Sequence, residues 1–171
     1  QGMREVVRVA AVIGRQFLHR VLAAASERSL DLDEKVKALQ RQELIDCVHQ
    51  FPELEYIFKH AVVQETIYAS LFEERRRKIH RLVADCLESL FSGELEQFYA
   101  VLAYHYVRAE DWANAQRYLF LAADQAHRLA ADEDALPNFE GALAILDKAG
   151  ERKLAPLELA TIRRKLGNIQ Y

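Results

Sequence analysis

One histidine stands where a short strand is predicted to meet a helix. The run from Tyr56 to Phe58 is aromatic and β-branched, and the segment from Ala61 onward has apolar residues at helical spacing, with His60 between the two. The first N–H groups of a helix are free to donate hydrogen bonds, and the helix dipole favours an anion there. His60 could therefore donate to a phosphate. The alternative is that its imidazole caps its own helix or bonds to a nearby carbonyl group.

The other histidines and the two cysteines show no spacing that favours metal binding or nucleophilic catalysis. Cys47 and His49 are separated by one residue, which is too little for a four-ligand zinc site. The sequence also lacks the glycine-rich loop that holds nucleotide phosphates. We expect no catalytic residues and no metal ligands in this chain. A nucleotide near His60 would have to be held by another part of a larger protein.

The composition predicts a folded, soluble protein. Of its 171 residues, 51% are hydrophobic and 29% are charged, with a net charge of -3. This mixture can bury a core, and it creates no strong field that would attract nucleic acid or an anionic membrane. Cysteines without paired spacing fit a reducing compartment, and no apolar run is long enough to cross a bilayer. We expect a cytoplasmic protein without a membrane partner.

Helices should dominate, because glycine and proline are scarce and apolar residues recur with helical period. Two helices are predicted at about 4–13 and 18–25. A third starts at Asp31 or Asp33 and carries an apolar stripe that extends to Ile45. The single predicted strand is 54–58, with a short partner near 45–48. Three helices followed by a small hairpin are typical of a winged helix.

The second part of the chain differs in character from the first. Two more helices are predicted at 61–72 and 74–91, and helical hairpins with small residues at regular intervals follow. We place the boundary at 92–96, which gives a first domain at 1–91 and a second at 97–171. The expected fold is mainly α, with a winged-helix-like domain and one small β-hairpin before a helical repeat array.

Large, aromatic and small side chains alternate in the second domain in the order typical of one repeat motif. The matching residues are Tyr99, Leu102, Ala103, Tyr106, Trp112, Ala115, Leu119 and Ala122, with partial recurrences at Ala135, Phe139 and Ala142 and at Leu166-Gly167. This pattern resembles a tetratricopeptide-repeat array. Ala115 and Ala135 are closer together than the roughly 34 residues of a whole repeat, so the array is irregular and incomplete.

The repeat resemblance implies a surface for a protein or peptide partner. Gln97, Ala100, Tyr104 and Arg108 would line the concave side of the first hairpin, while Tyr106 would face the core. The alternative is that so short an array mainly supports the winged helix. Trp112 is expected to be structural, packed between the helices of the hairpin.

Several short pieces of sequence, in order along the chain, point to one class of signalling protein. They are residues 10–17, 58–65 and 68–71, then Arg76, Ile79-His80, Val83-Ala84 and Leu87-Glu88, and finally 102–106. Together they resemble the winged-helix segment that follows the nucleotide-binding core in signalling ATPases of the STAND class. Such ATPases are fused to bacterial class III adenylate or guanylate cyclases and to large transcriptional regulators.

This second resemblance gives His60 a role. In relatives of this class a histidine at the start of this helix contacts the β-phosphate of ADP and helps to hold the resting state. His60 matches that histidine, whereas Ala61 stands where an aspartate often follows. The resemblance implies a non-catalytic regulatory segment that couples ATP or ADP in an upstream nucleotide-binding domain to downstream repeats of the same chain.

The output in the parent protein would be cyclase activity or transcription. Residues 58–88 are most similar to the cyclase group, so a class III cyclase is the preferred parent. A segment of an ATPase-type transcriptional regulator is one alternative. A stand-alone protein-binding adaptor with no nucleotide link is the other.

A winged helix also raises the question of DNA binding. The predicted third helix and its flanks carry more acidic than basic residues, so this region would repel a duplex. The acids are Asp31, Asp33, Glu34, Glu43 and Asp46, and the bases are Lys35, Lys37 and Arg41. The basic run from Arg75 to Lys78 is expected to form a solvated helix face paired with nearby acids such as Glu73 and Glu74. We therefore expect no nucleic-acid partner.

Overall fold

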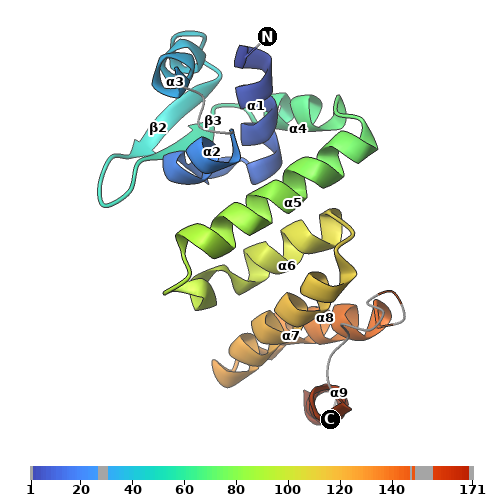
Figure 1. The fold of residues 1–171 in the computed structure, drawn as a ribbon. Coiled ribbons are helices and arrows are strands. Elements are labelled where there is room, and N and C mark those ends of the chain that lie inside the picture. The colour runs from blue at the N-terminus through green and yellow to red at the C-terminus, as the bar shows by residue number, and fades with distance from the viewer. Residues whose placement is uncertain (1, 27–30, 147, 149–155, 170–171) are drawn as a thin grey trace. The chain divides into compact units, whose positions relative to one another are not determined.

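The computed structural model describes residues 2–26, 31–146, 148 and 156–169 (Figure 1). Contacts divide the chain into two units, Gln1–Leu90 and Phe91–Tyr171, and each is considered by itself below. Most of the described residues are helical, and the strands form one small antiparallel sheet. The prediction of a mainly α fold with a small β-hairpin is confirmed.

The first unit contains the hairpin together with five helices in its described residues. In chain order these elements are α1 (Gly2–Ile13), β1 (Gln16–Leu18), α2 (His19–Ala25), α3 (Leu32–Arg41), β2 (Ile45–His49), β3 (Glu55–Phe58), α4 (Ala61–Ala69) and α5 (Glu73–Leu90).

The sheet has one more strand than the sequence predicts. Its order is β1-β3-β2, with both pairs antiparallel, and Phe17 pairs with Tyr56 while Ile45 pairs with Phe58. The hairpin of β2 and β3 lies where it is predicted. Strand β1 was not predicted because three residues are too few to show the alternation by which a strand is recognised.

Helix α3 is shorter than predicted and ends at Arg41. Glu43 adopts a left-handed backbone with φ 57°, which stops the helix before Leu44 and Ile45. Ile45 is therefore the first residue of β2, where its side chain is fully buried.

The core of the first unit lies between the helices and one face of the sheet. Helix α5 contributes Ile79, Val83 and Leu87, which are spaced four residues apart and form a single buried stripe. The sheet contributes Phe17 and Phe58, which are both buried. The centres of their rings lie 5.8 Å apart. Burying each such side chain contributes roughly 1.5–3 kcal/mol.

A side-chain hydrogen bond fastens α4 to α1. The Nε2 of Gln64 donates to the carbonyl oxygen of Ala11 at 2.6 Å. Ala11 is in the last turn of α1, where carbonyl groups lack partners within the helix. Helix α4, which begins directly after His60, is therefore held to the body of the unit by a polar link.

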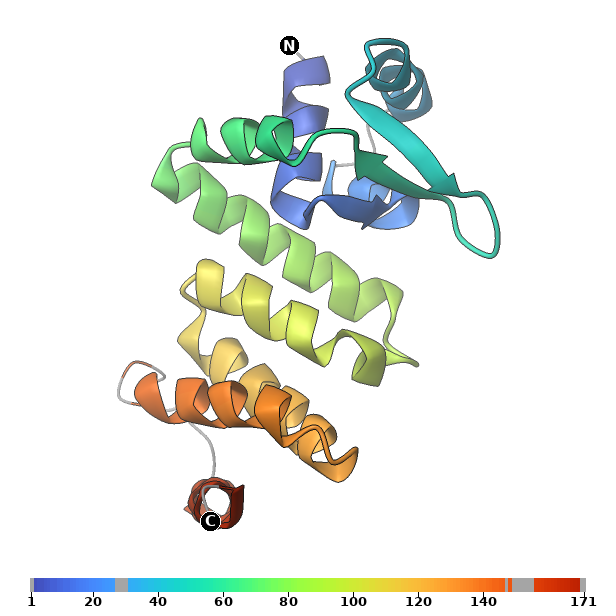
Figure 2. The same cartoon turned by 180° about the vertical axis from the view of Figure 1, so that it is seen from behind.

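The second unit is a run of helices. Its elements are a short 3-10 helix η1 (Leu95–Phe98), then α6 (Tyr99–Arg108), α7 (Trp112–Arg128), α8 (Asp132–Ala144) and α9 (Pro156–Ile169). Each α-helix of this series packs against the next, as Figure 2 shows for α6, α7 and α8. At its start, the ring of Phe91 lies 4.1 Å from that of Phe98 between centres, so Phe91 belongs with this unit.

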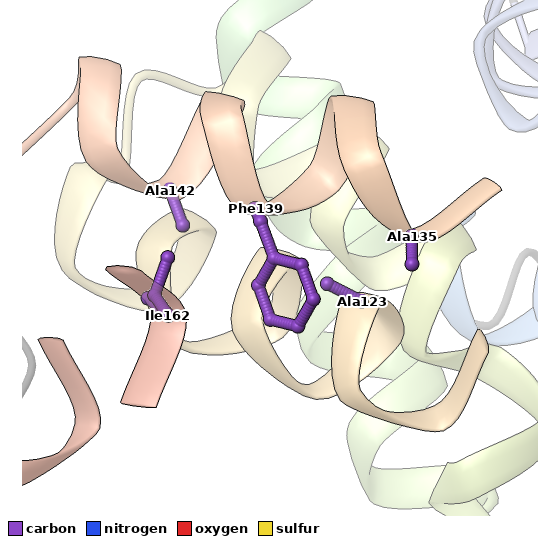
Figure 3. Packing of buried hydrophobic residues seen from close by; sticks show 5 residues of the cluster. All are labelled: Ala123, Ala135, Phe139, Ala142 and Ile162. Atoms are coloured by element: carbon purple, nitrogen blue, oxygen red, sulfur yellow. The ribbon is translucent and has the colours of Figure 1, made fainter. Parts of the chain in front are cut away.

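Small residues let α7, α8 and α9 approach closely around one large ring. Figure 3 shows Phe139 of α8 surrounded by three alanines and an isoleucine, all with fully buried side chains: Ala123, Ala135, Ala142 and Ile162. Leu166 of α9 packs against the same cluster. Deeper in α6 and α7, the rings of Tyr106 and Tyr118 are stacked with centres 5.5 Å apart and planes inclined by 8°.

Within the described residues, three helices end in the same way without a glycine. Glu43 after α3, Glu110 after α6 and Ala130 after α7 all have φ near +57°, at 57°, 56° and 57°. In each case the left-handed residue and the one after it donate to carbonyl groups of the last turn, as Ala130 does to His127 at 3.1 Å and Ala131 to Ala126 at 2.9 Å. This is the Schellman arrangement, which usually has glycine at the left-handed position.

Candidate functional site

His60 is the N-cap residue of α4 and lies two residues after the end of β3. Its backbone is extended, with φ −121° and ψ 122°, and its carbonyl oxygen accepts a hydrogen bond from the N–H of Val63 at 3.1 Å. The imidazole is exposed and makes no capping hydrogen bond. The alternative in which His60 caps its own helix is therefore wrong for this structure.

The strand before His60 is anchored on both sides. The N–H of Phe58 donates to the carbonyl of Arg15 at 2.8 Å, and the N–H of Lys59 donates to the carbonyl of Leu44 at 3.1 Å. The Lys59 ammonium lies 3.6 Å from the carboxylate of Glu43. His60 thus follows a fixed segment, with one paired cation directly before it.

Helix α4 is apolar yet lacks a fully buried side chain. Val62 is 70% exposed, and Phe72, in the turn that follows α4, is 87% exposed. Val62 stands near the start of α4 and Phe72 comes after its end. Large exposed apolar side chains that form a patch are typical of a surface that contacts another protein or domain. Sequence reasoning missed these two residues, because apolar residues on a short helix are usually assigned to the core.

The four predicted partner-binding residues are all exposed. Gln97 is in η1, and Ala100, Tyr104 and Arg108 follow at four-residue intervals on α6, which places them on one face of the helix. The Arg108 guanidinium lies 5.4 Å from the ring centre of Tyr104, a cation–π contact. The sequence therefore identified a continuous exposed face.

Val101 is an addition to this face. Its side chain is 41% exposed and lies three residues before Tyr104 on α6. Tyr106, by contrast, is fully buried, as predicted, and so is Leu102. The sequence could have indicated the exposure of Val101, because Val101 lies outside the helical spacing of the buried residues Leu102 and Tyr106.

Two histidines are core residues. His80 is 1% exposed, and its Nε2 lies 3.0 Å from the hydroxyl oxygen of Tyr68. The guanidinium carbon of Arg76 lies 5.1 Å from the centre of the Tyr68 ring. His105 is also 1% exposed, and burial lowers its pKa to about 4. His105 therefore stays neutral near pH 7, because desolvation disfavours the charged form of its imidazole.

Three other histidines lie beside carboxylates. Nε2 of His19 is 3.0 Å from Asp33, and Nδ1 of His49 is 3.1 Å from Glu55. Nδ1 of His127 is 2.7 Å from Asp132. Among the described residues, histidines, cysteines and acids do not gather in groups of three or more that could hold a metal ion.

The basic run at the start of α5 is paired with acids, as predicted. Arg77 donates to Glu73 and Lys78 donates to Glu74, each at 2.6 Å and one helical turn apart. Arg75 instead forms an ion pair with Glu5 of α1.

Trp112 begins α7 and is partly buried, with the ammonium of Lys148 4.7 Å above its ring.

In the described part of the chain, every helix is too short or too polar to span a membrane. Comparison of the chain with protein-family models, with curated proteins and with solved structures finds no match.

Proposed function

We propose that this chain is a regulatory and protein-interaction segment of a larger signalling ATPase. In this proposal it couples the nucleotide state of an upstream domain to a downstream repeat array of the same chain. The preferred parent is a cytoplasmic class III adenylate or guanylate cyclase, because residues 58–88 are most similar to that group. The segment itself would perform no catalysis, and ATP or ADP would be bound by the parent.

The observation that carries this proposal is the exposed imidazole of His60, which makes no capping hydrogen bond at the start of α4. Its ring nitrogens and the first N–H groups of α4 are both available to an anion. A phosphate presented by a neighbouring domain could accept hydrogen bonds from both. The exposed side chains of Val62 and Phe72 support contact with such a domain on α4 and the turn after it.

The test is binding of labelled ADP to the parent protein. We expect His60→Ala to weaken ADP binding by roughly tenfold, which corresponds to one charge-assisted hydrogen bond, and to raise the basal output. His49→Ala is the matched control, because His49 is an exposed histidine on the hairpin of the same unit. Unchanged ADP affinity together with unchanged basal output would remove the switch role of His60.

A second candidate function is a stand-alone protein-binding adaptor. The exposed pair of Tyr104 and Arg108 favours it, because aromatic and arginine side chains contribute most to protein interfaces. The adaptor function would be supported if the parent protein has no nucleotide-binding domain and if Tyr104→Ala abolishes binding of a protein partner. In a parent with an ATPase domain, cyclase activity or transcription would identify the output.

A further inference from the structure

A partly open pocket of about 310 Å³, called the cavity below, lies within the first unit. It lies among α1, α2 and α5, which pack side by side (Figure 1). It is formed by described residues of all three helices. Its apolar part consists of Val9 from α1, Ala25 from α2, and Ile79 and Leu82 from α5. The volume is at the lower end of the range for small-molecule sites, which is about 300–1,000 Å³.

The polar part of the lining carries more positive than negative charge. Arg75 and Lys78 come from α5, and Glu5 comes from α1. On α5, Arg75, Lys78 and Leu82 are three and four residues apart and therefore share one face of the helix. One face of α5 thus supplies both two cations and part of the apolar surface.

The cations are held by weak partners. Arg75 pairs with Glu5, and Lys78 pairs with Glu74, but the side chains of Arg75 and Lys78 are 53% and 66% exposed. Ion pairs with this exposure contribute little free energy, and each cation retains several N–H donors. A carboxylate that enters the cavity can therefore bond to both without breaking a strong contact.

A hydroxyl group adds a second, independent indication of a ligand. Ser26, which follows α2, also lines the cavity. Its Oγ is shielded from solvent and has no hydrogen-bond partner among the described residues. Buried hydroxyl groups are normally hydrogen-bonded, and a rotation of the Ser26 side chain would let this one donate to an acceptor in the cavity.

We infer that this cavity binds a small amphipathic monocarboxylate. The apolar tail would lie against Val9, Ile79 and Leu82, and the carboxylate would accept hydrogen bonds from Arg75, Lys78 and Ser26. The volume equals that of roughly ten water molecules, which fits a medium-chain fatty acid or an arylalkanoate with about ten non-hydrogen atoms. A single negative charge fits best, because Glu5 remains in the lining. This site is independent of the role proposed for His60.

Octanoate is the probe that tests this inference, titrated into the 171-residue chain and followed by NMR and calorimetry. We expect saturable binding at one site, with shifts at the amides of Val9, Ala25 and Leu82. Octanol and octylammonium have the same tail without the negative charge, and we expect them to bind at least about tenfold more weakly.

Variants of α5 separate the site from non-specific binding. Arg75→Gln and Lys78→Gln should each weaken octanoate binding by about threefold to tenfold, because each removes a charge-assisted hydrogen bond. Leu82→Trp should abolish binding by filling the cavity. Arg77→Gln is the matched control, since Arg77 is a neighbouring cation on α5 that pairs with Glu73 outside the cavity, and it should leave binding unchanged.

Three results would overturn the inference. They are titration without saturation, equal affinity for octanoate and octylammonium, and unchanged octanoate affinity in both glutamine variants. The glutamine variants keep the test decisive even if Leu82→Trp fails to fold, because Arg75 and Lys78 are exposed enough for substitution to leave the packing intact.

Discussion

Gln116 of α7 completes the end of α8 by donating a hydrogen bond from Nε2 to the carbonyl oxygen of Ala142 at 2.9 Å. Ala142 is in the last turn of α8, where carbonyl groups lack an N–H partner within the helix. Gln116 is fully buried, so water cannot take over this role. The hydrogen bond is thus a buried polar contact between α7 and α8.

Replacing this amide should destabilise the second unit. We expect Gln116→Leu to lower the free energy of unfolding by about 1–3 kcal/mol, because it leaves a buried carbonyl without its donor. Gln125→Leu on the same helix, where the side chain is only partly buried, should cost less than about 0.5 kcal/mol. Urea unfolding followed by the fluorescence of Trp112, the single tryptophan, measures both. Equal losses in the two variants would contradict a specific role for Gln116.

His105 should make the second unit sensitive to acid. Its pKa is lowered from 6.5 to about 4 by burial, so the folded state holds it neutral while the unfolded state takes up a proton. The neutral His105 makes its full contribution to the free energy of unfolding above pH 6.5, and this contribution is lost as the pH falls towards 4. The loss amounts to about 3 kcal/mol by linkage.

The variant His105→Gln removes this titration. We expect the free energy of unfolding to fall less steeply between pH 7 and pH 4 in the variant than in the parent chain, with carboxylates contributing equally to both. Parallel pH profiles for His105→Gln and the parent chain would rule out His105 as the titrating group.

Glycine at the left-handed helix ends should stabilise the protein. Ala130 has φ 57°, a conformation that costs most residues roughly 1–2 kcal/mol and costs glycine little. Part of the gain is offset because glycine makes the unfolded chain more flexible, so we expect Ala130→Gly to raise the free energy of unfolding by about 0.5–1 kcal/mol. Ala126→Gly, inside α7, should lower it by about 1 kcal/mol. Thermal unfolding compares the two, and a loss at both positions would be the contrary result.

Arg20 connects the hairpin loop to the end of α5 in the first unit. It forms an ion pair with Glu53, and its Nη2 donates to the carbonyl oxygen of Leu90 at 2.7 Å. We expect Arg20→Ala to lower the free energy of unfolding by about 1 kcal/mol, a modest value because the ion pair is partly exposed. Arg20→Lys should recover only part of it, since an ammonium lacks the planar fork of a guanidinium. Arg15→Ala is the exposed control, and an equal loss there, measured by urea unfolding, would argue against the link.

The sequence predicted those parts of the fold that have a local signal. Strand β3 and the start of α4 were recognisable because the apolar period changes between Phe58 and Ala61. The end of α3 was misplaced because Glu43 occupies a position where glycine would have marked it. The face formed by Ala100, Tyr104 and Arg108 was predictable because one helix carries it.

The cavity could not be predicted in the same way. Its lining comes from three helices, and the partners Glu5 and Arg75 are 70 residues apart in the sequence. Neither the pairing of these charges nor the shielding of the Ser26 hydroxyl leaves a trace in local periodicity. Such features depend on tertiary packing.

The middle position of β3 in the sheet determines how the segment carrying His60 can respond to a force. Because β3 is hydrogen-bonded to β1 on one edge and to β2 on the other, a pull on the following residues is resisted by two ladders at once. Separating β3 from the sheet would require the hydrogen bonds to β1 and those to β2 to break together. Displacement of this segment should therefore carry the whole sheet with it as a rigid body, instead of peeling away a single strand.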